Sequence, residues 1–213
     1  MTTSGVGGVT EPKYLMFQMF APILLGGQQL DLRTTMDAIL TAVNSTRGDG
    51  VRQQLGFCYG PLALEHTDTE LRDMIRAAFT IAEEKDVAVC FHIDDSMFWK
   101  RRSDLWDVTV NTANAKNIEA VDWGGTSITY RMDLSFAGVV LAPQMRYNSP
   151  MIQTEITRLA RDVIGREIKA GVDRLESLGK GHLFAGVIAG WESETEWDYT
   201  VEPQPATLIR NLA

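Results

Sequence analysis

The sequence predicts an α/β fold, a partial (β/α) barrel with about four parallel strands. Three observations support this class: short apolar runs recur along the chain, segments of helical periodicity separate them, and the links between them are short. This alternation is typical of parallel strands joined by right-handed crossovers. We expect residues 1–213 to form a single barrel-like domain, incomplete by itself, with a long β-rich insertion at 94–148 over the carboxyl ends of the strands. An open, doubly wound sheet of four strands is the alternative.

The first part of the chain predicts three strands and two helices. The strands are expected at 14–20, 54–59 and 87–93, and the second is expected to stop at Gly60-Pro61. The first helix is expected at 34–47, where the apolar residues share one face. The second helix begins after Thr67, because Glu70 stands at the spacing of a capping box.

The second part begins with the insertion, which breaks the alternation. It contains no convincing helix, and a hairpin is expected across Gly124-Gly125. An insertion this long at the end of a strand is usually functional, because a loop that only connects two elements is much shorter. A long helix is then expected from Pro150 to Gly179. The fourth strand is expected at 183–189, a nearly unbroken apolar run typical of a strand buried on both faces.

Carboxylates and indoles crowd the chain directly after this fourth strand. Trp191, Glu192 and Glu194 all follow Gly190 within four positions. Catalytic groups of α/β sheets and barrels lie at the carboxyl ends of the strands, so these residues are candidates for an active site. A polar turn after a buried strand is the plainer interpretation of the same residues.

Composition excludes several classes of partner. The formal charge of −8 and the pI near 4.9 argue against binding to a phosphate backbone, so no nucleic-acid partner is expected. No apolar stretch approaches about 20 residues, so no membrane partner is expected. The chain as given carries no secretion leader and would stay in the cytoplasm, whereas an incomplete N-terminus would leave secretion open. Cys58 and Cys90 are expected to be buried free thiols.

Three short motifs follow predicted strand ends or precede the long helix: FHIDDSMFW at 91–99, APQMRYNSP at 142–150 and GVIAGWESE at 186–194. In this arrangement the chain resembles the N-terminal half of the (β/α)8 barrel of bacterial glycoside hydrolases of the clan A type. The acid/base glutamate of that clan lies at the end of the fourth strand. The resemblance therefore implies that Glu192 or Glu194 is the catalytic acid/base, and no cofactor or metal is expected for this chemistry.

Two features depart from the pattern of the clan. Asn normally precedes the acid/base glutamate, whereas Trp191 precedes Glu192 and Ser193 precedes Glu194 here. The nucleophile of the clan comes from a seventh strand, which is not among the four strands predicted. We therefore expect a half barrel that needs a homodimeric partner or a second barrel half, because four strands alone leave two exposed sheet edges.

Glycosidic hydrolysis needs two carboxyl groups, one to protonate the leaving oxygen and one to attack or to activate water. The apolar ring of Trp191 could raise the pKa of Glu192, as a general acid requires. Asp94 or Asp95 could be the second carboxylate or could bind sugar hydroxyls, although such a pair also caps turns. Indoles stack on sugar rings, and some of the five tryptophans are expected to be structural. The predicted substrate-binding residues are His92, Asp94, Asp95, Trp99, Trp123, Tyr147, Asn148 and Trp191.

Three functions remain open on this evidence. The first is a glycoside hydrolase acting on an oligo- or polysaccharide. The second is a metal-dependent hydrolase of the deacetylase type, with His92, Asp94 and Asp95 as ligands. The third is a non-catalytic carbohydrate-binding module that has the aromatic rim without a working pair of carboxylates.

Overall fold

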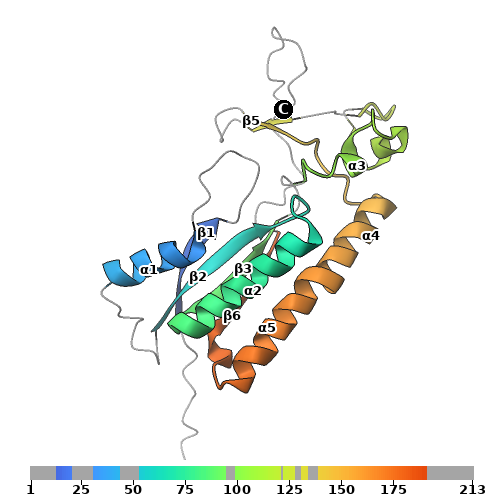
Figure 1. Ribbon diagram of the computed structural model, residues 1–213. Helices are drawn as coiled ribbons and strands as arrows, with labels where there is room; N and C mark the ends of the chain where they lie inside the picture. Colours follow the sequence, from blue (N-terminus) through green and yellow to red (C-terminus); the bar gives the residue numbers. More distant parts are fainter. Residues whose placement is uncertain are drawn as a thin grey trace, which may run out of the picture.

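A four-stranded parallel sheet forms the centre of the molecule (Figure 1). The computed structural model describes residues 13–20, 31–43, 53–94, 99–120, 122–127, 131–133 and 139–190, with backbone alone at 131–133 and 139–141. The strands are β1 (Lys13–Phe20), β2 (Gln53–Leu62), β3 (Ala88–Ile93) and β6 (Phe184–Ala189), adjacent in that order and all parallel. The predicted α/β class with four parallel strands is therefore confirmed.

Helices connect these strands. They are α1 (Leu32–Ala42), α2 (Asp68–Lys85), and a continuous segment made of α4 (Pro150–Arg158), a π-helix η2 (Leu159–Gly165) and α5 (Arg166–Ser177), followed by the 3-10 helix η3 (Gly181–Leu183). Figure 1 shows α2 and the α4–α5 segment side by side along the sheet. No helix in the described part of the chain has the length and apolar character that crossing a membrane requires.

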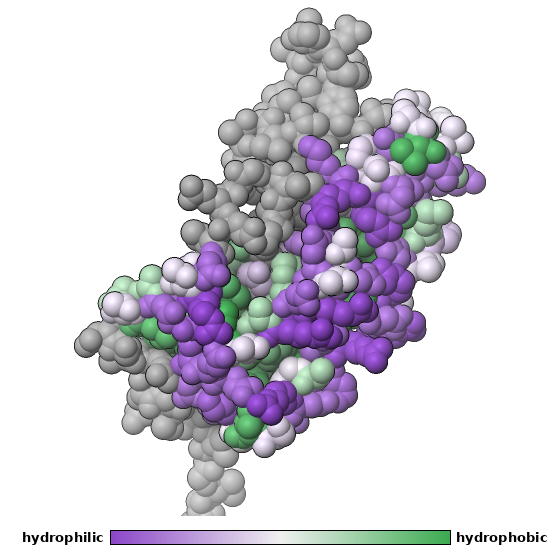
Figure 2. All heavy atoms as spheres, viewed as in Figure 1, coloured by the Kyte–Doolittle hydropathy of each residue, from purple (hydrophilic) through white to green (hydrophobic). Residues whose placement is uncertain are grey.

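The core lies between the sheet and these helices. Phe57 of β2 and Phe91 of β3 are fully buried against the apolar face of α2. Phe79 of α2 packs on Phe91, with 5.3 Å between the ring centroids. The outer surfaces of α2 and α5 are hydrophilic (Figure 2). Two ion pairs, Arg76–Glu167 and Arg174–Glu83, join these helices.

The start of α2 follows the predicted capping box. The Thr67 hydroxyl accepts a hydrogen bond from the Glu70 N–H at 3.2 Å, and the Glu70 carboxylate accepts one from the Thr67 N–H at 2.7 Å. The two bonds satisfy N–H groups that have no partner within the helix. The predicted start of the second helix is confirmed.

Two strand predictions are wrong. β2 does not stop at Gly60-Pro61 but continues to Leu62, because Leu62 pairs with Ile93 of β3 after a shift in register. β6 is not buried on both faces, since Val187 is 43% exposed and Ile188 is 37% exposed. Within the described residues β6 pairs with β3 alone, so it forms an edge of the sheet.

The insertion contains short helices that the sequence did not predict. Its elements are α3 (Ser103–Trp106), the 3-10 helix η1 (Thr112–Lys116), β4 (Arg131–Asp133) and β5 (Val139–Leu141), the last two antiparallel. The hairpin predicted across Gly124-Gly125 is seen as an antiparallel bridge between Ala120 and Ser127. Figure 1 shows α3 and β5 beyond the ends of β2 and β3, with α3 next to the start of α4.

Candidate functional site

The parallel register places the carboxyl ends of three strands side by side. The backbone N–H of Asp94 donates to the carbonyl oxygen of Leu62 at 3.2 Å, which joins the end of β3 to the end of β2. The N–H of Gly190 donates to the carbonyl of Ile93 at 2.9 Å, which joins the end of β6 to β3. The segments leaving these strands therefore start at one edge of the sheet, the position of active sites in α/β proteins.

Four titratable side chains are buried at this edge. They are Glu65 and His66 after β2, and His92 and Asp94 at the end of β3; Asp94 is fully buried. Burying a carboxylate or an imidazole is unfavourable unless polar partners surround it, so clusters of this kind are typical of functional sites. The sequence had indicated His92 and Asp94 as members of such a site, and the structure brings both to the same edge.

Burial determines the charge of His92. Desolvation lowers the pKa of His92 below its usual 6.5, so the imidazole is neutral at pH 7. A neutral imidazole has one donor nitrogen and one acceptor nitrogen, so it can donate a hydrogen bond to a hydroxyl group or accept one from it. His92 is two positions before Asp94 in the chain, so the two side chains project toward the same side of β3.

Glu65 connects the edge to the start of the insertion. One carboxylate oxygen of Glu65 accepts a hydrogen bond from the backbone N–H of Arg101 at 3.1 Å. The loop after β2 and the segment after β3 are thereby fixed to each other. Glu65 was not among the predicted site residues; its position three residues after β2 was the available signal.

The predicted acid/base residues, Glu192 and Glu194, lie outside the described residues, as do Asp95 and Trp191. Their assignment stays a prediction. In the sequence, Trp191, Glu192 and Glu194 lie one, two and four positions after Gly190, and Asp95 follows Asp94 directly.

Trp99 has a packing role in this structure. The ring is completely buried, and its Nε1–H donates to the carbonyl oxygen of Pro143 at 2.9 Å. The bond fixes the segment after β3 to the segment that leads into α4, and stacking of this ring on a sugar stays a prediction.

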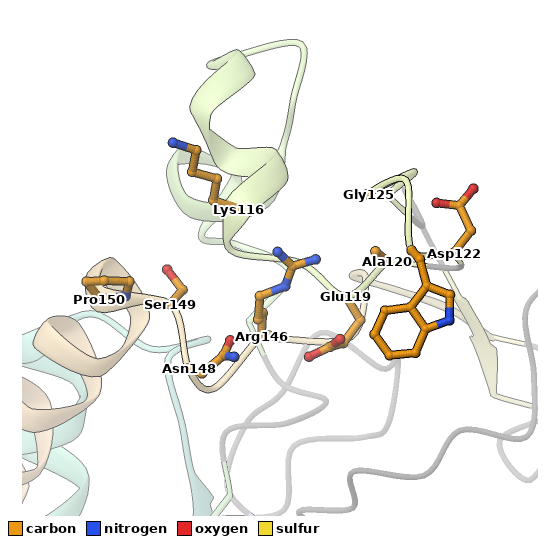
Figure 3. Close-up of a pocket in the computed structure, with 10 residues that line it drawn as sticks. Lys116, Glu119, Ala120, Asp122, Gly125, Arg146, Asn148, Ser149 and Pro150 are labelled. Atoms are coloured by element: carbon orange, nitrogen blue, oxygen red, sulfur yellow. The ribbon is translucent and has the colours of Figure 1, made fainter.

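A separate pocket of about 850 Å³ lies in the insertion, beside the start of α4 (Figure 3). It contains two of the predicted substrate-binding residues, the fully exposed Trp123 and Asn148. Tyr147 precedes Asn148 and is half-buried, but it does not line the pocket. The lining residues are Lys116, Glu119, Ala120, Asp122, Trp123, Gly125, Arg146, Asn148, Ser149 and Pro150.

The charged groups of this pocket differ in how they are held. The Asp122 carboxylate accepts a hydrogen bond from the Thr126 N–H at 3.0 Å, and that bond lowers the pKa of Asp122. Arg146 and Glu119 form no ion pair with the described residues, and in Figure 3 their charged ends point in different directions. The sequence prediction missed Arg146, although it stands within the APQMRYNSP motif.

Cys58 and Cys90 face each other across β2 and β3 in the parallel register. Both are free and buried, as predicted. A hydrogen bond between the thiols raises the pKa of Cys58 and lowers that of Cys90. Cys90 lies two residues before His92 on β3, and Cys58 lies beside it on β2.

A metal site of the deacetylase type has no ligand set in the described part of the chain. No group of three or more His, Cys, Asp or Glu side chains is placed there to hold a metal ion, and one of the three predicted ligands, Asp95, lies outside that part.

Comparison with known proteins adds no relative: no family model, no curated protein and no solved structure matches this chain.

Proposed function

We propose that the protein is a glycoside hydrolase of the (β/α)-barrel type that acts on an oligo- or polysaccharide, with Glu192 or Glu194 as the general acid/base. The observation that carries this proposal is the register of β6 on β3. The chain leaves β6 at Gly190, which is hydrogen-bonded to Ile93, directly beside the buried Asp94. Two carboxylate-bearing segments thus leave adjacent strands at the same edge.

Strand order supports a barrel rather than a doubly wound sheet. The spatial order β1-β2-β3-β6 is the order of these strands in the chain, so every crossover moves in the same direction. A doubly wound sheet reverses direction at a switch point, whereas a (β/α) barrel does not. Closure needs further strands, which a second copy or a second barrel half would supply. The exposed Phe20 of β1 and Val187 of β6 fit such pairing at the two edges.

The chemistry assigns a role to each group. The general acid protonates the glycosidic oxygen, and a second carboxylate attacks the anomeric carbon or activates water. Asp94 is the candidate for the second carboxylate among the described residues, because it follows β3 at the edge to which β6 leads. The neutral His92 beside it would bind a sugar hydroxyl without adding a positive charge that would oppose the oxocarbenium-like transition state.

The test is hydrolysis by Glu192→Gln and Glu194→Gln variants. Wild-type protein is assayed on a panel of nitrophenyl glycosides and polysaccharides by release of nitrophenol or of reducing ends. One of the two substitutions is expected to lower kcat by about 10²–10⁴-fold, the usual contribution of a general acid/base. Glu176→Gln, an exposed glutamate of α5 without an ion pair in the described part, is the matched control and should keep full activity. Full activity in both test variants would contradict the proposal.

The exposed Trp123 in the pocket favours a second candidate, a non-catalytic carbohydrate-binding module. An exposed indole beside polar side chains is a common way to bind a sugar ring. Oligosaccharide binding without hydrolysis by the wild-type protein, unchanged in both glutamine variants, would support this candidate over the hydrolase.

A further inference from the structure

We propose that the pocket between η1 and the start of α4 binds an acidic sugar unit, a uronic acid, with Arg146 as the residue that binds its carboxylate. This inference rests on the proposed function insofar as the ligand is taken to be a carbohydrate. Beyond the proposed function, it specifies that the ligand is negatively charged and that it binds in a pocket outside the carboxyl edge.

Arg146 differs from the other arginines with described side chains in being half-buried without an ion pair. Among arginines with described side chains, eight form ion pairs: Arg33, Arg72, Arg76, Arg101, Arg102, Arg158, Arg161 and Arg174. Arg166 has none but is exposed to solvent. Arg146 has none and is half-buried in the wall of a pocket. A half-buried guanidinium has lost part of its hydration, so a carboxylate that enters the pocket would gain a bidentate partner.

The remaining charges of the pocket leave this position open to an anion. Lys116 is a second cation without an ion pair among the described residues. Of the two acidic residues, Asp122 is held by the N–H of Thr126. Glu119 directs its carboxylate away from the guanidinium of Arg146 (Figure 3). Two cations without an ion pair among the described residues are unusual in a chain of net charge −8, which offers many acidic side chains for pairing.

The other lining groups match the rest of a sugar. Glu119 and the Asn148 amide can bind hydroxyl groups, and the exposed indole of Trp123 offers a flat apolar surface for the face of a ring. The volume of about 850 Å³ lies within the range of small-molecule sites, about 300–1,000 Å³. A uronic acid combines a carboxylate, hydroxyl groups and an apolar ring face, so it has a partner in this pocket for each of its parts.

The walls of the pocket are fixed to each other and to the end of the sheet. The N–H of Arg146 donates to Asn117 at 2.8 Å, and the N–H of Glu119 donates to Gln144 at 2.9 Å. The Trp99–Pro143 bond continues this connection to the segment after β3. A glycan unit in the pocket would thus be held by a part of the chain that is anchored to the carboxyl edge.

The test measures binding of the full chain to acidic polysaccharides by affinity electrophoresis in native gels. The probes are polygalacturonate, alginate, hyaluronan and glucuronoxylan, each beside its carboxyl-reduced counterpart, in which the uronic acid has become a neutral hexose. At least one acidic probe is expected to bind, and its reduced form about tenfold more weakly or not at all. Arg146→Met should weaken binding to the acidic probe by about tenfold, while Arg166→Met, the matched exposed arginine, should not.

Several results would overturn the inference. They are binding to no acidic probe, equal binding to the acidic and reduced forms, and equal binding by Arg146→Met and the wild type. Circular dichroism and a melting curve establish that Arg146→Met is folded, and Arg146→Lys should retain part of the affinity if charge is the cause.

Hydrolysis that persists in both Glu192→Gln and Glu194→Gln would end the proposed function and leave this inference standing. Hydrolysis of neutral glycans alone, lost in one of these variants, would end this inference and leave the proposed function standing.

Discussion

The backbone N–H of Gly190 donates a hydrogen bond of 2.9 Å to the carbonyl oxygen of Ile93. This bond is the last one between the end of β6 and β3, and it places Gly190, where the description of this segment ends, next to Ile93, which directly precedes the buried Asp94. Parallel pairing of two segments about 95 residues apart thus brings the ends of β3 and β6 to the same edge of the sheet.

The capping box of α2 should contribute measurably to stability. Thr67→Ala removes the hydroxyl that accepts from the Glu70 N–H, and we expect a loss of about 1 kcal/mol in the free energy of unfolding. Thr80→Ala in the same helix removes an exposed hydroxyl that bonds only to the carbonyl of Arg76 and should change stability by less than about 0.5 kcal/mol. Urea denaturation of both variants checks this; equal effects would mean that the cap is not formed in solution.

Glu155 should make stability depend on pH. Arg158 and then Arg102 hold the pKa of Glu155 at about 2, below its usual 4.5, through hydrogen bonds of 2.9 and 2.7 Å. A lowered folded-state pKa gives stability that is present above pH 4.5 and is lost as the pH falls toward 2. Glu155→Gln should therefore cost about 1–2 kcal/mol at pH 7.

The difference between wild type and Glu155→Gln should shrink between pH 4.5 and pH 2, as measured by urea denaturation at several pH values. Glu176→Gln serves again as the exposed control. A difference that stays constant over this range would show that Glu155 acts through packing and not through its charge.

Gly171 allows α5 to approach α2 closely. A Cβ atom at position 171 would lie 2.1 Å from the Phe79 ring, so Gly171→Ala should destabilise the protein by about 1–3 kcal/mol despite the better helix propensity of alanine. The smaller side chain of Phe79→Leu should make room for the methyl group. We expect the double variant to lose less than the sum of the two single losses, and strict additivity would argue against this contact.

Trp99 should behave as a core residue that anchors the insertion. Trp99→Phe removes the N–H that bonds to Pro143 and leaves a small cavity, for an expected cost of about 1–3 kcal/mol. Trp106→Phe is the matched control, because the half-exposed Trp106 donates a longer bond of 3.2 Å to Lys100. Thermal unfolding of the two variants separates them, and a loss for Trp106→Phe as large as that for Trp99→Phe would refute the anchoring role.

Local patterns were enough to predict most of the sheet and its helices. The apolar runs of β1, β3 and β6 and the capping box of α2 are encoded within a few neighbouring residues, so their positions could be found to within one or two residues. The continuation of β2 to Leu62 could not be predicted from local patterns, because it depends on pairing with Ile93, about thirty residues away. The short helices of the insertion escaped prediction for a similar reason. They are held by side chains such as Asn117, whose amide donates to the carbonyl of Leu105 at 2.8 Å.

The candidate site was predicted in outline. The sequence shows that His92 and Asp94 lie at the end of an apolar run. The structure shows in addition that both are buried at the edge shared with β6. The burial of Trp99, and the absence of an ion pair for Arg146 among the described residues, depend on the whole arrangement of the insertion, so no motif could have shown them.

The distance between the carboxyl groups of Asp94 and of Glu192 or Glu194, in a crystal structure that shows them, tests the central claim most directly. The proposed hydrolase requires one of these glutamates at about 5–5.5 Å from Asp94 for a retaining mechanism or about 6.5–9.5 Å for an inverting one. Both glutamates well beyond about 10 Å, on the face of the sheet away from His92, would contradict catalysis at this edge.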